Sequence, residues 1–143
     1  MKGLLYMSLI MFAIVVSSCG RTGNSGRFQE AYENDTIIKL TSVKFDALTL
    51  DLGKVEEGEQ VVTKFVFMNT GKENLLLQNV SASCGCTKPK FDASPISPGR
   101  KSEIEVTFDT RGRSGRQRNS VMVATNTKPP NTVLTFTCEV IPR

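Results

Sequence analysis

Apolar and polar residues alternate along most of the chain beyond residue 40, which is the pattern of β-strands with one buried face. The clearest run covers residues 103–109, where Ile104, Val106 and Phe108 alternate with acidic residues and threonine. A run at 75–80 changes parity, which predicts a β-bulge near Gln78 or Asn79. Shorter alternating runs occupy residues 48–52, 61–67, 121–123 and 134–140.

Segments rich in glycine, proline and asparagine separate these runs and predict turns. They lie at residues 56–59, 69–72, 97–100, 111–115 and 126–131. Nothing beyond residue 40 predicts a helix of three turns. Six or seven short antiparallel strands in about 100 residues predict an all-β fold, an immunoglobulin-like antiparallel β-sandwich of about seven strands. We expect this domain to occupy residues 40–143.

The N-terminus has a different pattern. A short positive start is followed by a largely apolar run at 4–16, shorter than the roughly 20 residues of a membrane-spanning helix but typical of a secretory signal. The next residues, Val16-Ser17-Ser18-Cys19, resemble the bacterial lipobox. That resemblance implies cleavage before Cys19, a diacylglyceryl group on its thiol and an acyl chain such as palmitate on the new amine. The alternatives are ordinary secretion with cleavage at a small-residue site, and an uncleaved anchor.

The chain is therefore predicted to contain a cleaved signal peptide at 1–18, a lipidated flexible tether at 19–39 and the sandwich at 40–143. A tether of ~20 polar residues spans about 25 Å, enough to hold a domain off a lipid surface. These acyl chains on Cys19 would give firm membrane attachment, because stable anchoring needs more than one buried chain. No acidic residue, which some bacterial lipoproteins use there as a surface-export signal, occurs between Cys19 and Phe28. We expect a domain in the bacterial cell envelope, lipid-anchored and facing the periplasm.

Composition narrows the functional classes. The net charge of +4 is modest and no basic stripe with interleaved aromatics occurs, which disfavours nucleic acid as a partner. The absence of histidine removes the commonest general base and the commonest metal ligand. The absence of tryptophan excludes the Cys–Trp–Cys core of antibody domains. We expect no enzymatic activity and no small-molecule substrate.

Several motifs occur in order at residues 52–58, 65–71, 81–87, 96–99 leading into 104–108, and 125–127. Together they resemble a family of bacterial secreted and lipid-anchored proteins labelled domain of unknown function fifteen-seventy-three. The resemblance covers residues 48–140, and its most specific piece is Ser-Cys-Gly-Cys-Thr at 83–87. It implies an immunoglobulin-like sandwich related to sperm-protein and cilia-associated β modules, which serve as binding or scaffolding units. Cys138 is a departure, since the family's last strand more often carries glycine.

Cys84 and Cys86 admit three interpretations. An oxidising compartment favours a disulfide between them, but on an extended strand their Cα atoms would be about 7 Å apart, so the bond would be strained and easily reduced. Two thiolates could hold a soft metal, chiefly Cu(I), whereas zinc lacks further ligands. Alternatively, two small thiols pack where a strand leaves the sandwich and Gly85 permits a turn. The sequence favours the disulfide and simple packing about equally, with metal third and a catalytic thiol last.

Two further features carry expectations. Cys138 shares an apolar face with residues of the last strand, so we expect a core residue, and the odd cysteine count beyond Cys19 leaves one thiol free. Four arginines around two glycines predict a solvated basic loop, with contact to anionic lipid or an acidic partner as the alternative. These arginines are Arg111, Arg113, Arg116 and Arg118.

The sequence thus favours a lipid-anchored, non-enzymatic binding or scaffolding module of the bacterial envelope. Such a module presents a sandwich edge or loop end to another envelope protein. The alternative is a soft-metal (copper) or thiol redox protein that uses Cys84 and Cys86.

Overall fold

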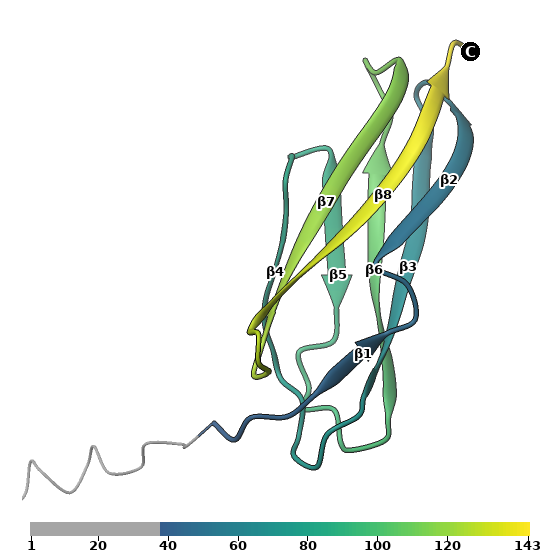
Figure 1. Cartoon of the computed structure of the whole chain (residues 1–143). Coiled ribbons are helices and arrows are strands. Elements are labelled where there is room, and N and C mark those ends of the chain that lie inside the picture. Colours follow the sequence, from purple (N-terminus) through teal and green to yellow (C-terminus); the bar gives the residue numbers. More distant parts are fainter. Residues whose placement is uncertain (1–37) are drawn as a thin grey trace, which may run out of the picture. The chain divides into compact units, whose positions relative to one another are not determined.

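A computed structural model describes residues 38–143. The predicted signal peptide, Cys19 and nearly all of the tether at 19–39 lie outside the described residues. Eight strands form two four-stranded sheets (Figure 1), with the orders β1-β3-β6-β5 and β2-β8-β7-β4. The strands are β1 (Val43–Phe45), β2 (Thr49–Glu56), β3 (Gln60–Asn69), β4 (Leu77–Ala82), β5 (Thr87–Phe91), β6 (Lys101–Asp109), β7 (Gly115–Thr125) and β8 (Asn131–Ile141).

The predicted β-sandwich is confirmed, with eight strands instead of about seven. The two strands that no alternating run covers, β1 and β5, are short: β1 has three residues, and β5 has five with Pro89 at its centre. No helix occurs among residues 38–143, so the described chain has none that could cross a membrane.

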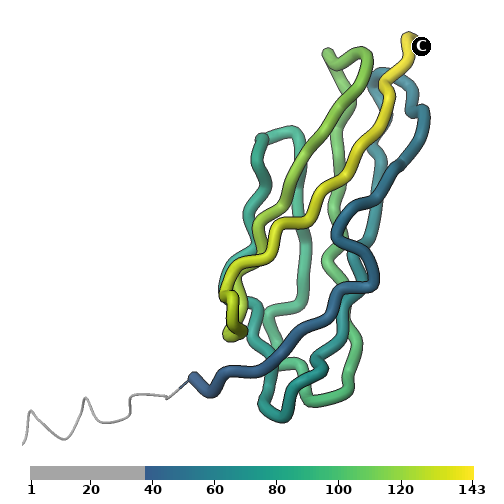
Figure 2. The backbone as a smooth tube through the Cα atoms, viewed as in Figure 1, coloured from purple at the N-terminus to yellow at the C-terminus, as the bar shows by residue number. Residues whose placement is uncertain are grey.

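One strand pair departs from the predicted antiparallel arrangement. β2 pairs with β8 in parallel, while the other paired strands run antiparallel. The chain leaves β1 in one sheet and crosses to the other, where β2 follows β8 in the same direction (Figure 2). Strand direction within a pair depends on this crossing, which hydrophobic alternation does not encode.

The core lies between the two sheets and is built from the predicted alternation. Ile104, Val106 and Phe108 of β6 are fully buried, and they face buried residues of β7 and β8 such as Phe136. The Phe108 and Phe136 rings meet edge to face at 5.4 Å between centroids. Burying each such side chain contributes about 1.5–3 kcal/mol. The burial of these apolar side chains therefore determines which face of each strand points into the core.

Bulges interrupt two strands. The register of β4 against β7 shifts between Leu77 and Asn79, which confirms the predicted bulge. The register of β2 against β8 shifts between Asp51 and Lys54. Gly53 within this second bulge has φ of 67°, a conformation that glycine adopts without steric cost.

Buried side chains link the turns. At the end where residue 38 enters the domain, the Asn69 amide donates to the carbonyls of Glu73 (2.7 Å) and Ile96 (2.8 Å). Its oxygen accepts from Gly71 N and Thr41 Oγ1, each at 3.0 Å. Side-chain capping of this kind satisfies backbone groups that no strand partner reaches.

Candidate functional site

The Cys84-Gly85-Cys86 segment forms a tight turn that carries the chain from β4 in one sheet to β5 in the other. Backbone hydrogen bonds attach this turn to its surroundings. Ser83 N donates to Ser120 O (2.9 Å), Thr87 N to Cys84 O (3.2 Å) and Asp109 N to Cys86 O (2.9 Å). The turn lies at the end of the domain opposite residue 38, together with the β2–β3 and β6–β7 turns (Figure 1).

In the structure a disulfide joins Cys84 and Cys86. The expectation of a 7 Å spacing was wrong, because β4 ends at Ala82 and the two cysteines lie in a turn and not on an extended strand. Their Cα atoms are 5.3 Å apart, within the ordinary range for a disulfide. Loop-closure entropy gives such a three-residue loop only about 1.6 kcal/mol of stabilisation. The bond therefore adds little to a corner that strand pairing already holds.

Two buried polar side chains lie beneath the disulfide. Cys84 Sγ is 3.4 Å from both Thr87 Oγ1 and Asn119 Oδ1, whereas Cys86 Sγ is 3.7 Å and 3.9 Å from the same atoms. Thr87 is 4% exposed and Asn119 is 7% exposed. Both sulfurs thus share one polar floor, and Cys84 is the closer of the two.

The Asn119 carboxamide is not satisfied by this arrangement. A disulfide sulfur carries no hydrogen, so neither sulfur can donate to Asn119 Oδ1. Its Nδ2 is buried and has no hydrogen-bond partner within residues 38–143. An unpaired buried donor is costly. Rotating the carboxamide so that Oδ1 and Nδ2 exchange places would put Nδ2 next to the sulfurs as a hydrogen-bond donor.

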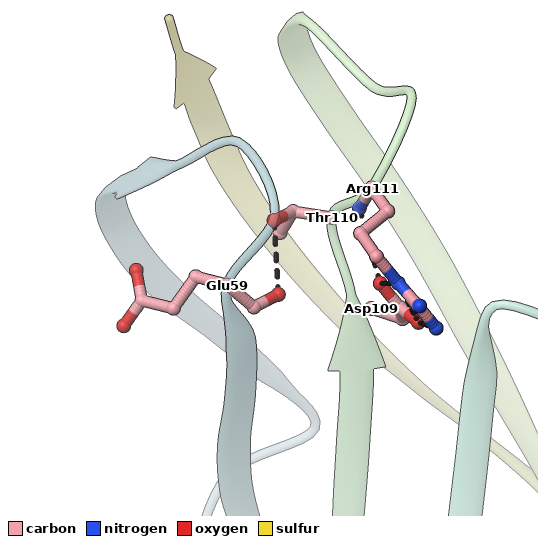
Figure 3. Close-up of polar contacts among 4 residues, drawn as sticks. All are labelled: Glu59, Asp109, Thr110 and Arg111. Atoms are coloured by element: carbon pink, nitrogen blue, oxygen red, sulfur yellow. Dashed lines mark hydrogen bonds and ion pairs between the residues drawn. The ribbon is translucent and has the colours of Figure 1, made fainter. Parts of the chain in front are cut away.

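Cys86, and not Cys84, borders a hollow of about 440 Å³ on the β5–β6 side of the corner. The hollow contains two cationic groups and one carboxylate. Arg111 donates to Asp109 through its Nε at 2.9 Å and 3.0 Å and through a guanidinium amine (Figure 3). These bonds lower the pKa of Asp109 to about 2. The lining residues are Gln60, Gly85, Cys86, Lys88, Thr107, Asp109 and Arg111.

Thr110 fixes the wall of this hollow. Its buried hydroxyl contacts the carbonyl of Glu59 at 2.9 Å (Figure 3). The hydroxyl also contacts the carbonyl of Glu56 (2.8 Å), and the backbone N–H of Thr110 donates to Glu59 O at 3.0 Å. The β6–β7 turn is thereby attached to the β2–β3 turn. Asp109 and Arg111 flank Thr110 in sequence, so their position beside Cys86 is set by these bonds.

The structure distributes the four predicted arginines over different environments. Arg111 pairs with Asp109, and the Arg113 guanidinium lies 5.7 Å from the centroid of the Phe108 ring. Arg116 and Arg118 belong to β7 and not to the turn. Only Arg111 among the four lines the hollow beside Cys86.

Cys138 lies in the core and forms no disulfide, as its position on an apolar face predicts. Burial raises the pKa of its thiol, and the negative charge of Asp51 adds to this effect. Within residues 38–143 no group of three or more potential ligands from histidine, cysteine, aspartate and glutamate could hold a metal ion.

Sequence reasoning missed an apolar surface on the outer face of the β2-β8-β7-β4 sheet. Met122 and Val133 are register neighbours on β7 and β8 and are 50% and 51% exposed. The signal was present, since both are apolar residues at positions where the alternation calls for polar ones. They border a shallow hollow of about 190 Å³, whose other lining residues are Ser81, Ala82, Ser83 and Ser120.

The paired sheets and crossing connections define the class of protein, an immunoglobulin-like β-sandwich module. The chain belongs to the family described as "Protein of unknown function (DUF1573)", which matches residues 43–140 and confirms the resemblance seen in the sequence. No curated protein matches the chain.

Solved structures support the fold assignment. A Porphyromonas gingivalis W83 protein of unknown function aligns with a TM-score of 0.63 and 18% identity, over 76% of this chain and 50% of that one. This chain thus spans half the length of that protein. PapD-like domain 7 of human CEP192, an ASH / PapD-like domain, aligns with a TM-score of 0.61 and 12% identity, over 73% and 88% of the two chains. The Vibrio cholerae VesB protease aligns with a TM-score of 0.54 and 14% identity, over 79% and 34%.

Proposed function

We propose that the protein is a lipid-anchored, non-enzymatic binding or scaffolding module of the bacterial cell envelope. The observation that carries the proposal is an uncharged patch around Met122 and Val133, on a face that carries Arg116, Arg118 and Glu139 further along β7 and β8. Half-exposed apolar residues beside a hollow lined by serine and alanine favour docking of an uncharged protein surface. The partner is an envelope protein that presents apolar and small polar side chains to this face.

The opposite face of the sandwich provides the contrast. There, Lys64 on β3 donates to Glu103 at 2.6 Å and lies 3.9 Å from Glu105, both on β6. Exposed charges of this kind stay solvated and contribute little to association. Val62 on the same face is 54% exposed and lies beside this charged ladder, so it serves as a control position.

The sheet edges are poor candidates for strand addition. β1 has three residues, β5 carries Pro89 between two lysines, and β2 and β4 each contain a bulge. Short, bulged, lysine-bearing and proline-bearing edges are devices that block edge-to-edge pairing. We therefore favour the sheet face over the edge as the docking surface.

A photo-crosslinking amino acid placed in living cells tests the docking face. At Met122 we expect one discrete crosslinked product, which a Val133→Glu substitution removes. At Val62 we expect none. Absence of a product at Met122 in several growth conditions, or an equal product at Val62, would count against the face.

The anchor is supported by the Val16-Ser17-Ser18-Cys19 sequence and has its own test. We expect metabolic labelling with a fatty-acid analogue to mark the wild-type chain and not the Cys19→Ala variant. We also expect that variant to lose the processed, membrane-bound form. A Cys19→Ala variant that still partitions into membranes as a processed protein would refute lipidation at this residue.

A further inference from the structure

We infer that the corner at Cys84 and Cys86 is a thiol–disulfide exchange site in which Cys86 receives the thiolate of a dithiol and Cys84 leaves. This inference is independent of the docking face. It rests on the disulfide, on the buried unpartnered amide of Asn119, and on the unequal surroundings of the two sulfurs.

The surroundings assign the two sulfurs different roles. Both cysteines are half-buried and Cys86 also packs against the core, but only Cys86 borders the 440 Å³ hollow, which gives an incoming thiolate a path to this residue. Cys84 does not border that hollow, and its sulfur lies closer to the Thr87 hydroxyl and the Asn119 carboxamide, at 3.4 Å from each. Attack at one sulfur of a disulfide expels the other as a thiolate. Here the buried floor receives the expelled sulfur.

The exchange balances without a further reactant. The first thiolate of the dithiol attacks Cys86 Sγ, the Cys84–Cys86 bond breaks, and the electron pair leaves on Cys84 Sγ. The second thiolate of the dithiol then attacks the dithiol sulfur that is bonded to Cys86 Sγ, and Cys86 leaves as a thiolate. The dithiol loses two electrons and becomes a disulfide, while Cys84 and Cys86 gain two electrons and take up the two protons.

Asn119 and Thr87 are positioning residues for the leaving sulfur. A thiolate accepts hydrogen bonds, and the Asn119 amide, once turned, together with the Thr87 hydroxyl would donate two. Reduction thus supplies the acceptor that Asn119 Nδ2 lacks. The same two donors form weaker hydrogen bonds with a neutral disulfide, so they stabilise the leaving thiolate more than the intact Cys84–Cys86 bond.

Charge in the hollow favours an anionic reactant. Arg111 is neutralised by Asp109, which leaves Lys88 as the unbalanced cation among the lining residues. Lys90 lies two residues further along β5 and does not line this hollow. We therefore expect the Lys88 side chain to attract an approaching thiolate and the Lys90 side chain to have no such effect.

The test uses the full chain in detergent with dithiothreitol as the dithiol, and follows opening of the disulfide by mass spectrometry after acid quenching. Removing a hydrogen bond to a charged group slows opening about tenfold, which is the expectation for Asn119→Leu and for Thr87→Val. Lys88→Ala slows opening at low salt and not at high salt. Lys90→Ala, the matched control, leaves the rate unchanged.

Single-cysteine variants separate the two roles. At a pH where both thiols are ionised, Cys84→Ser, which keeps Cys86, should react with oxidised glutathione faster than Cys86→Ser, which keeps Cys84. With both cysteines present and reduced, the Asn119→Leu substitution should shift the pH dependence of Cys84 alkylation to higher pH and leave that of Cys86 unchanged. A purely structural Asn119 would not move this profile.

Circular dichroism identifies variants that fail to fold, and the rates of folded variants decide the outcome. The inference is overturned by unchanged rates in folded Asn119→Leu and Thr87→Val, by equal reactivity of the two single-cysteine variants, or by opening that occurs only in denaturant. Because none of these readouts involves Met122 or Cys19, failure here leaves the proposed function standing.

Discussion

Opening the Cys84–Cys86 disulfide is expected to cost little stability. The bond closes a loop of three residues, for which chain entropy gives about 1.6 kcal/mol, below the 2–4 kcal/mol typical of longer loops. The three backbone hydrogen bonds from Ser83, Thr87 and Asp109 remain after opening and keep the turn in place. The reduced sandwich should therefore stay folded.

The assay is urea unfolding of the full chain in detergent, followed by far-ultraviolet circular dichroism. The Cys84→Ser/Cys86→Ser variant should lose about 1–2 kcal/mol of unfolding free energy relative to the oxidised wild type, with an unchanged dependence on urea. Reductant should bring the wild type close to the variant and leave the variant itself unaffected.

A loss well above about 3 kcal/mol, or loss of cooperative unfolding, would refute this reasoning. The bond would then act as a structural staple, and the reduced state that exchange requires would not persist. A loss near zero would agree with the argument, since strand pairing alone would be holding the corner.

Three other outcomes are expected. Asn69→Leu should cost about 2–5 kcal/mol in urea unfolding, because this fully buried side chain makes four hydrogen bonds that the variant lacks, whereas Asn79→Leu at an exposed strand position should be nearly neutral. The Asp109 carboxyl should titrate by NMR near its lowered pKa of about 2, and Arg111→Ala should return this pKa toward 3.8. The stability that the ionised carboxylate contributes is therefore present above pH 3.8 and is lost as the pH falls toward 2. Cys138 should resist alkylation in the folded protein and react on unfolding, because burial raises its pKa.

The sequence predicted the strands that bury one face and missed those that do not. Residues 103–109 alternate because their apolar positions fill the core, and the structure places a strand there. β1 is too short to show a period, and Pro89 gives β5 the composition of a turn. The parallel pairing of β2 with β8 depends on how the chain crosses between sheets, which no local pattern records.

The corner was predicted only in part. The Ser-Cys-Gly-Cys-Thr stretch drew attention to the two cysteines, but the extended geometry assumed for them was wrong. Asn119 lies more than thirty residues away and reads in sequence as an ordinary polar residue between Arg118 and Ser120. The register of β7 against β4, in which Val121 lies opposite Ala82, brings Asn119 beneath the sulfurs, and register is a tertiary property.

The corner and the docking face are adjacent yet open on different sides of the same turn. Ser83 precedes Cys84 and lines the hollow of the docking face, whereas Cys86 lines the hollow on the β5–β6 side. A partner seated against Met122 therefore need not cover the sulfur that we expect a thiolate to attack. Both surfaces would be usable at once, and crosslinking at Met122 should persist when Asn119→Leu slows exchange. A crosslink that disappears in Asn119→Leu would instead indicate that one partner serves both sites.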